Sequence, residues 1–430
     1  MSIKKLSSNS FPISWRVQRL SEFNARRPST INPVRYAQET FEYYSIPAYQ
    51  EGKSPALARG SEIGSSKLLL DAGTVLFGKL NPRVEKVWRV GNYTPNRKLG
   101  STEWVPLVPR DDVDEQFLYF LMWSEHVMPK AKTLVSGSTP SRQRVDPQSF
   151  YRIEAPLPPL PEQRKIASVL GLVQRAIEQQ EQLIALTTEL KKALMHKLFT
   201  EGLRGEPQKQ TEIGPVPESW NVVPLGTLAK IGNGSTPKRD NVSYWEEGSI
   251  PWLTSAKIHE RFITEADEFV TELAEKECHL PRVKPGSLLI AITGQGKTLG
   301  NSALISFETC ISQHLAYAKF HSLDTVPEFA LWYFQTRYQH LRSVSQAGGS
   351  TKGALTCGYL KTYPVPMPSR EEQREIADMF AALEQKEQVH IRKRQTLTDL
   401  LHTLLHQLMT AQIRVHDLDL SFLEQEAVAL

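Results

Sequence analysis

The chain has 430 residues, a formal net charge of +4, 40% hydrophobic residues and three cysteines, a length that suits two to four domains with their own cores. No apolar run approaches the roughly 20 residues of a membrane span, so we expect no membrane partner. The basic first residues lead into no apolar signal segment and the few cysteines suit free thiols, so we expect a cytoplasmic protein.

Positive charge is concentrated in the first third of the chain. Residues 1–155 hold 22 Lys and Arg against 15 Asp and Glu, a net +7, whereas residues 213–363 hold 14 of each sign. A basic domain suits a polyanion such as double-stranded DNA, although many basic domains bind no nucleic acid. Charge alone therefore favours a DNA partner only weakly.

The first region has the pattern of a mixed α/β domain. Short apolar runs at residues 68–70 and 74–77 predict strands, and residues 115–123 predict a helix with an aromatic core face. Its loops carry hydroxyl and basic side chains of the kinds that contact phosphates and base edges. The candidates are Lys79, Arg83, Arg97, Lys98, Ser138, Thr139, Arg142 and Arg144.

A long helix is predicted next. Pro156-Leu157-Pro158 precedes Glu162-Gln163-Arg164-Lys165-Ile166-Ala167, where Pro161 suits a first helical turn and Glu162 lies beside the positive end of the helix dipole. Apolar residues then recur with the 3.5-residue period of coiled coils, interrupted by polar residues in the middle that could fix register. The predicted pairing residues are Ile166, Leu170, Val173, Ile177, Leu194 and Leu198.

The second region again has the pattern of an α/β domain. Gly and polar residues at 202–210 predict a linker before it, residues 287–292 predict a strand, and residues 328–340 predict a helix. Tyr244, Trp245 and Trp252 suit a core better than a stacking platform for bases. The candidate DNA contacts are Ser235, Thr236, Lys238, Arg239, Gln295, Lys297, Ser350, Thr351 and Lys352.

The chain ends with a second copy of the long helix, 210 residues after the first. Pro366-Met367-Pro368 precedes Glu372-Gln373-Arg374-Glu375-Ile376-Ala377, and Ser369 with Glu372 has the spacing of a capping box. The residues around Trp15 and Trp220 repeat as well. The second set of predicted pairing residues is Ile376, Phe380, Leu383, Leu397, Leu401, Leu404 and Leu408.

One stretch imitates a nucleotide-binding motif. Ala291–Thr298 fits a relaxed P-loop with Ala in place of the first Gly, but a P-loop leads from a strand into a helix, and here turn residues and another apolar run follow. We expect a Gly-rich loop whose Lys297 could touch DNA phosphate, and we keep a coiled-coil P-loop NTPase as an alternative. No other catalytic motif, cofactor loop or metal-ligand spacing occurs, so we expect no catalysis, cofactor or metal.

The doubled Pro-x-Pro and Glu-Gln-x-x-Ile-Ala motif before each long helix resembles the specificity subunit of type I restriction–modification systems. Ser235-Thr236-Pro237, Gly294–Thr298 and Gln313–Ala316 are also similar to motifs of that family. The resemblance covers nearly the whole chain. It implies a non-catalytic subunit that reads a split DNA target, with an antiparallel pair of helices as spacer.

The resemblance also implies the partners, namely two methyltransferase (modification) subunits and restriction subunits with motor and nuclease activity. Because the two domains differ in sequence, the target should be asymmetric, each domain reading one half. A specificity subunit of a related restriction enzyme outside type I remains a further alternative.

We therefore predict an α+β fold with an internal pseudo-two-fold repeat, in which two mixed α/β target-recognition domains alternate with two long helices that pair as an antiparallel coiled coil. The predicted segments are the first recognition domain (1–155), first spacer helix (156–203), linker (204–216), second recognition domain (217–363), second spacer helix (364–415) and C-terminal tail (416–430).

Overall fold

The computed structural model describes residues 11–417, apart from 138, 140–141, 295–296 and 348–353. The chain divides into two compact units. The first contains Met1–Glu181 and Arg392–Leu430, and the second contains Gln182–Ile391. Each unit therefore includes one α/β domain and half of each long helix.

The first unit contains a five-stranded sheet in the order β2-β5-β8-β3-β4 and a three-stranded sheet in the order β7-β6-β9. Two antiparallel pairs, β1-β12 and β10-β11, complete it. The strands are β1 (Arg16–Arg19), β2 (Thr30–Ile31), β3 (Thr40–Tyr44), β4 (Ala56–Arg59), β5 (Lys67–Leu70), β6 (Val75–Gly78), β7 (Val87–Arg89), β8 (Lys98–Gly100), β9 (Trp104–Leu107), β10 (Val135–Ser136), β11 (Arg144–Val145) and β12 (Glu154–Leu157).

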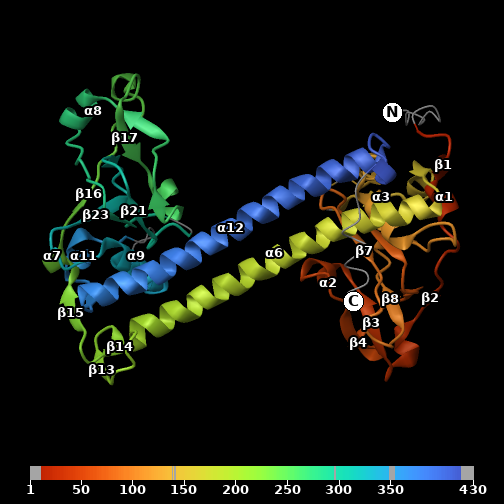
Figure 1. The fold of residues 1–430 in the computed structure, drawn as a ribbon, viewed down its shortest axis with the longest axis horizontal. Helices are drawn as coiled ribbons and strands as arrows, with labels where there is room; N and C mark the ends of the chain where they lie inside the picture. Colours follow the sequence, from red (N-terminus) through yellow and green to blue (C-terminus); the bar gives the residue numbers. More distant parts are fainter. Residues whose placement is uncertain (1–10, 138, 140–141, 295–296, 348–353, 418–430) are drawn as a thin grey trace. The chain divides into compact units, whose positions relative to one another are not determined.

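The helices of this domain are short (Figure 1). They are α1 (Leu20–Phe23), η2 (Pro33–Tyr36), α2 (Ile46–Gln50), η3 (Gly60–Glu62), α3 (Glu115–Trp123), α4 (Met128–Thr133) and α5 (Pro147–Tyr151). Helix α3 has the predicted bounds and buries Phe117, Phe120 and Leu121. The Asp114 carboxylate caps it by accepting from the backbone N–H groups of Gln116 and Phe117.

The second unit also has a five-stranded and a three-stranded sheet, but its main helix packs on the five-stranded sheet, whereas α3 packs on the three-stranded one. A five-stranded sheet has the order β16-β23-β20-β21-β18, a three-stranded sheet has the order β19-β17-β22, and β13-β14 and β15-β24 form pairs. The strands are β13 (Gln208–Thr211), β14 (Gly214–Pro217), β15 (Asn221–Pro224), β16 (Ala229–Asn233), β17 (Ile250–Leu253), β18 (Phe262–Ile263), β19 (Glu268–Val270), β20 (Leu288–Ala291), β21 (Ser302–Ile305), β22 (Cys310–Ile311), β23 (Leu315–Phe320) and β24 (Pro364–Met367).

The helices of the second domain are α7 (Leu225–Leu228), η5 (Val242–Tyr244), η6 (Ser255–His259), α8 (Glu272–Glu277), α9 (Pro327–Thr336), α10 (Tyr338–Ala347) and α11 (Cys357–Thr362). The prediction of a single helix at 328–340 is wrong, because the helix is interrupted at Arg337. The Arg337 guanidinium donates a hydrogen bond to the Ile213 carbonyl 2.9 Å away. The residues predicted as a linker include the hairpin β13-β14.

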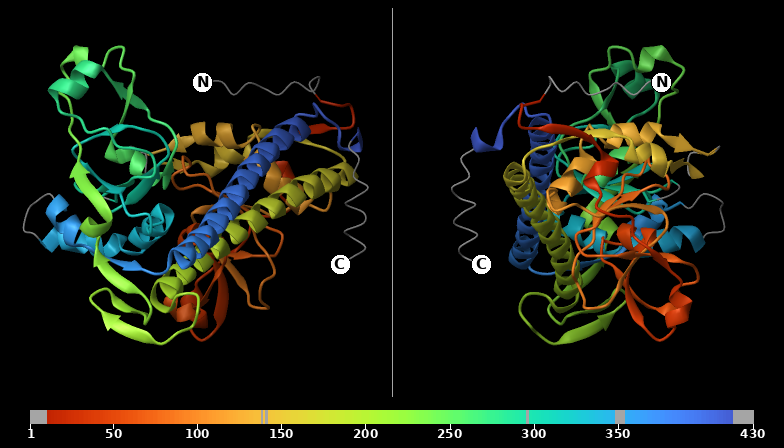
Figure 2. Two further views of the ribbon diagram at one scale, coloured as in Figure 1. Left: turned by 60° about the vertical axis from the view of Figure 1, so that its left-hand side comes forward. Right: turned by 90° about the vertical axis from the view of Figure 1, so that its right-hand side faces the viewer.

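Two long helices follow the two domains, α6 (Leu160–Glu201) and α12 (Arg370–Met409). They lie side by side and run in opposite directions (Figures 1 and 2). In the first unit the first half of α6 meets the second half of α12, and in the second unit the opposite halves meet. The predicted α+β fold with paired long helices is confirmed.

The apolar ends of the two helices belong to the cores of the domains. In the first unit, Ile166 and Leu170 of α6 and Leu408 of α12 join a cluster with Phe117 and Leu121 of α3. In the second unit, Leu198 of α6 with Ile376 and Phe380 of α12 join the corresponding cluster around α9. The helices are therefore fixed to the domains by continuous hydrophobic packing.

The short turn η7 (Val415–Asp417) ends the described chain, with Val415 buried in the first core. The C-terminal tail predicted at 416–430 lies outside the described residues from 418 on. Within the described residues, no helix combines the length and the apolar character needed to span a bilayer.

Candidate nucleic-acid interface and helix joints

Loops of the first domain bring several predicted DNA contacts together. The Asn81 N–H donates to the Gln143 carbonyl at 2.8 Å, and the Val145 N–H donates to the Lys79 carbonyl at 2.9 Å. The loop after β6 thus lies against the segment leading into β11. We call the predicted residues in these two segments the first loop cluster, which comprises Lys79, Arg83, Thr139, Arg142 and Arg144.

The first loop cluster exposes most of its positive charge. Arg83 and Arg142 are exposed and Lys79 is half-buried. The Arg144 guanidinium is paired with Glu103 through contacts of 3.1 and 3.2 Å, and this hydrogen-bonded carboxylate raises the pKa of Arg144. The cluster can offer cations to a phosphate backbone without rearranging the domain.

Two other candidates of this domain have partners inside it. Arg97 makes a two-pronged hydrogen bond to Glu39, at 2.6 and 2.7 Å, that lowers the pKa of Glu39. Lys98 is buried and its ammonium lies 3.8 Å from the fully buried Glu42. Because a buried lysine needs its counter-charge, we do not include Lys98 among the proposed DNA contacts.

In the second domain, the loop after β16 gathers Ser235 and Thr236 beside the strand-end segment 311–315. The Ser235 N–H donates to the Ile311 carbonyl at 3.1 Å, and the Gln313 N–H donates to the Thr236 hydroxyl at 3.4 Å. A Cβ at Gly234 would lie 1.9 Å from the Ile311 carbonyl oxygen, so only glycine permits this approach. His314, which belongs to the motif Gln313–Ala316 and hydrogen-bonds to Thr293, lies in the same segment.

Arg239 and Lys238 differ in their surroundings. The Arg239 guanidinium pairs with Glu268 and lies 4.0 Å from the Trp245 ring centroid and 5.0 Å from that of Trp252. Trp252 is buried, as predicted for a core residue. Lys238 is exposed, and its carbonyl accepts from the Trp245 indole at 3.0 Å. The aromatic side chains therefore support this loop from the inside.

The stretch that imitates a P-loop connects two antiparallel strands. β20 ends at Ala291 and β21 begins at Ser302, and the two pair in antiparallel register. The exposed Lys297 stands in this connection, where its carbonyl accepts from the Tyr338 hydroxyl at 2.7 Å. A strand-to-strand connection lacks the helix N-terminus that binds phosphate in a P-loop. Five predicted contacts, Ser138, Gln295, Ser350, Thr351 and Lys352, lie outside the described residues.

The doubled Glu-Gln motif forms two helix joints, where each domain meets its long helix. In the first joint, the Glu162 carboxylate accepts from the Trp15 indole at 3.0 Å and from the Arg414 guanidinium at 2.8 and 3.0 Å. In the second joint, the Glu372 carboxylate accepts from the Trp220 indole at 3.1 Å and from the Leu203 N–H at 2.9 Å. Each glutamate ties a Trp-containing strand start to its helix.

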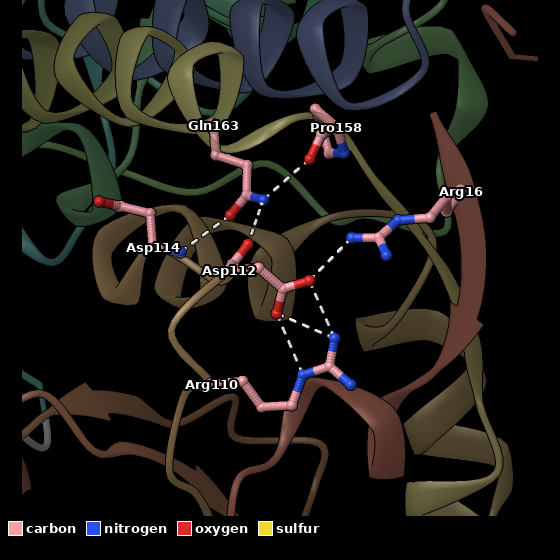
Figure 3. Close-up of polar contacts among 6 residues, drawn as sticks. All are labelled: Arg16, Arg110, Asp112, Asp114, Pro158 and Gln163. Carbon is pink, nitrogen blue, oxygen red and sulfur yellow. Dashed lines mark hydrogen bonds and ion pairs between the residues drawn. The ribbon is translucent and has the colours of Figure 1, made fainter. Parts of the chain in front are cut away.

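The glutamines of the motif reach into the domains, as Figure 3 shows for Gln163. The Gln163 amide donates to the carbonyls of Asp112 and Pro158, at 2.9 and 2.8 Å, and accepts from the Asp114 N–H at 2.8 Å. In the second joint, the Gln373 amide donates to the carbonyls of Asp324 and Pro368, both at 3.0 Å, and accepts from the Val326 N–H at 2.9 Å. The two glutamines therefore use the same atoms in the same way, whereas the two glutamates share only the contact with Trp.

The capping box predicted at the second helix is only half formed. The Glu372 N–H donates to the Ser369 hydroxyl at 3.2 Å, as predicted. The Glu372 carboxylate, however, binds Trp220 and Leu203 instead of the Ser369 N–H. The Glu372 side chain therefore makes tertiary hydrogen bonds in place of the local capping bond that its spacing predicts. Gly202, in the left-handed conformation after α6, brings the Leu203 N–H to this carboxylate.

The middle of the helix pair differs between the units. In the second unit, the buried Lys191 of α6 pairs with Glu384 and Glu387 of α12, and Arg261 of the domain also binds Glu384 at 2.7 Å. At the repeat-related positions of the first unit stand Leu401, Gln174 and Ile177. There, a cavity of about 640 Å³ opens between both helices and α3.

Residues 217–399 match the family model of the type I restriction modification DNA specificity domain. Over 439 residues the chain is 21% identical to the specificity subunit of the type I restriction enzyme MjaVIII of Methanocaldococcus jannaschii, with 97% of each chain covered. It is 23% identical over 358 residues to the EcoR124I/EcoR124II specificity subunit of Escherichia coli, with 81% of this chain and 82% of the relative covered. Residues 217–399 therefore belong to the type I restriction–modification specificity-domain family, and nearly the whole chain is similar to type I specificity subunits.

Solved structures share the fold of this type I specificity subunit. The S subunit of a type I restriction-modification system from M. genitalium superposes with a TM-score of 0.59 at 17% identity, covering 94% of this chain and 97% of the other. A chain from a study of complex assembly and conformational transition of the type I R-M system gives 0.54 at 21% identity, covering 93% and 98%.

Family membership also decides between the alternatives left open by the sequence. The methyltransferase and nuclease activities of a type I enzyme lie in partner subunits, so the chain is a DNA specificity subunit without catalysis of its own. The matches support a specificity subunit of type I over the coiled-coil NTPase and over a subunit outside type I.

Proposed function

We propose that this DNA specificity subunit reads an asymmetric, bipartite DNA target, one half with each recognition domain. We assign the recognition domains to residues 1–155 and 217–363, and the spacer to α6 (Leu160–Glu201) and α12 (Arg370–Met409) within the predicted segments 156–203 and 364–415. The linker is assigned to 204–216 and the tail to 416–430. One observation carries the proposal: two α/β domains with unlike loops are attached to paired helices through two glutamines that make the same three hydrogen bonds. A duplicated scaffold with unlike loops suits two different half-sites on one duplex.

The proposed DNA contacts are the cationic and hydroxyl side chains of the loops. In the first domain they are Lys79, Arg83, Thr139, Arg142 and Arg144, and in the second Ser235, Thr236, Lys238 and Lys297. Arg97 and Arg239 are also proposed contacts, and their ion pairs with Glu39 and Glu268 hold their own loops in shape. The five candidates outside the described residues keep the status of sequence predictions.

The long helices set the gap between the half-sites and carry methyltransferase subunits. Leu183, Leu186 and Leu190 of α6 are 38, 62 and 50% exposed, and their spacing puts them on one face of the helix. An exposed apolar stripe of this kind supports docking of a partner helix. We propose two methyltransferase subunits per chain, joined by restriction subunits with motor and nuclease activity, in the cytoplasm.

The test is the pattern of methylated bases in cells that carry this chain with its methyltransferase subunit. The expected pattern is one asymmetric motif of two parts with a gap of constant length. Exchanging residues 217–363 for the corresponding domain of a relative should change one part only. A continuous motif, or a change in both parts, would contradict the proposal.

A further inference from the structure

The glutamines of the two helix joints have no solvent exposure. Gln163 and Gln373 are both 0% exposed, and each amide both donates and accepts hydrogen bonds. Each donates to the carbonyl of the proline before its helix and to a carbonyl in the loop before the main domain helix, α3 or α9. A single side chain therefore connects the helix start to the element on which the domain core is built.

A buried amide of this kind fixes the orientation of the bound loop as well as its distance from the helix. Hydrophobic packing between helix and domain is non-directional, whereas three hydrogen bonds from one planar amide fix the loop to within the narrow range of hydrogen-bond geometry. We propose that Gln163 and Gln373 are positioning residues that hold each recognition domain in one orientation on its helix and thereby fix the accepted gap between half-sites. This inference rests on the bipartite target of the proposed function.

The first joint has an additional attachment that the second lacks. The Asp112 carboxylate accepts from Arg16 at 2.8 Å and from Arg110 at 2.9 and 3.0 Å (Figure 3). At the repeat-related positions of the second joint, Asn221 replaces Arg16 and the exposed Asp324 replaces Asp112. Orientation in the second joint therefore depends more heavily on its glutamine.

The test is binding of the purified complex with its methyltransferase subunits to duplexes whose gap is the native length or one base pair longer or shorter. Gln373→Met removes the hydrogen bonds while keeping the side-chain length. We expect the preference for the native gap to fall about tenfold, with the half-site sequences unchanged. Gln163→Met should reduce it less, and Gln179→Met, the same change at an exposed position of α6, should leave it unchanged.

A second pair of variants keeps the test independent of the folding of Gln373→Met. Arg16→Asn copies the second joint, and its guanidinium is 55% exposed, so the variant should fold. Combined with Gln163→Met, it should lower gap preference to the level expected for Gln373→Met. A purely structural role would weaken binding to all gaps alike, and an unchanged preference would overturn the inference. A wild-type complex without a fixed gap would instead overturn the proposed function.

Discussion

At the level of single residues, Lys297 has the sequence environment of a nucleotide-binding lysine and the structural environment of a hairpin loop. Because β20 and β21 are antiparallel neighbours, we expect Lys297→Ala to leave ATP turnover of the purified chain at the background level of the wild type. Phosphate release measures this. Turnover well above background that disappears in the variant would contradict the assignment as a specificity subunit.

The exposed cations of the loops should act through phosphate contacts. We expect Arg142→Ala and Lys238→Ala each to reduce the slope of log K against log salt concentration by about 1, because each releases roughly one fewer counterion. Binding of the methyltransferase complex to its target at several salt concentrations gives the slope. Arg35→Ala, at an exposed position outside the loop cluster, is the matched control. Equal slopes for Arg35→Ala and Arg142→Ala would count against the loop cluster.

Residue types and spacing could predict which loops are basic, but not which charges are already paired. Arg83 and Lys98 look equivalent in the sequence, yet one is exposed and the other lies beside the buried Glu42. The repeat identified Glu162 and Glu372 as important, but their Trp partners lie 147 and 152 residues away. Helix-start rules describe only neighbours within a turn, so they assigned both carboxylates to local roles.

At the level of elements, the end of α12 should be essential to the first core. Leu408 is 1% exposed within that core, whereas Leu400, two turns earlier, is 43% exposed. We expect Leu408→Asp to destabilise the first unit by several kcal/mol, since it buries a carboxylate without a partner. Leu400→Asp should change the stability by less than about 0.5 kcal/mol. Urea unfolding of the two variants measures the difference, and equal midpoints would mean that α12 is not part of the core.

The buried ion cluster of the second unit offers a stricter test. We expect Lys191→Leu to cost about 3 kcal/mol, because it removes the ion-pair partner of Glu387 and leaves Glu384 with Arg261 alone. Adding Glu384→Gln and Glu387→Ile copies the residues of the first unit and should recover most of that loss, since apolar replacements of a whole buried ion cluster are often neutral. The urea midpoints of the single and triple variants measure these two changes in stability. A triple variant no more stable than the single one would show that the two units are not interchangeable here.

The same cluster predicts a pH dependence. Burial by itself raises the pKa of Glu387, but hydrogen bonds from Lys191 and Thr188 outweigh it and lower the pKa below its ordinary value. A carboxylate with a lowered folded-state pKa contributes stability above its unfolded pKa, roughly 4.3, and loses it as pH falls through the folded value. The urea midpoint of the wild type should therefore drop more steeply below about pH 4.5 than that of the triple variant.

The long helices were predictable because the heptad period and the helix starts are local signals. The order of strands was not, since neighbours such as β3 and β8 pair across a long stretch of intervening chain that includes β4 to β7. The break between α9 and α10 falls at Arg337, whose guanidinium contacts the Ile213 carbonyl far away in the sequence. Local patterns therefore describe the helix pair well and the recognition domains poorly.

At the level of the whole molecule, the helix pair should act as a ruler for the gap. Duplicating Glu181–Thr187 after Thr187 and Ile391–Leu397 after Leu397 keeps the heptad register of both helices. Seven residues add ~10 Å, which corresponds to about three base pairs of DNA. We expect the gap in the methylated motif to grow by that amount while both half-sites stay unchanged.

Sequencing the methylated bases of cells with the double insertion measures the gap. The control is the insertion in α6 alone, which should misalign the helices and abolish methylation. An unchanged gap in the double insertion would mean that the helices do not set the distance.

The first unit is built from two pieces of chain, and this has a consequence for synthesis on the ribosome. Arg414 binds Glu162, the His126 ring hydrogen-bonds to the Met409 carbonyl at 2.9 Å, and Leu408 and Val415 fill the first core. The second unit, in contrast, is one continuous segment, Gln182–Ile391. Domains generally fold in the order of their synthesis. Here the first unit can complete its core only after the end of α12 has been translated, whereas the second unit can fold before that.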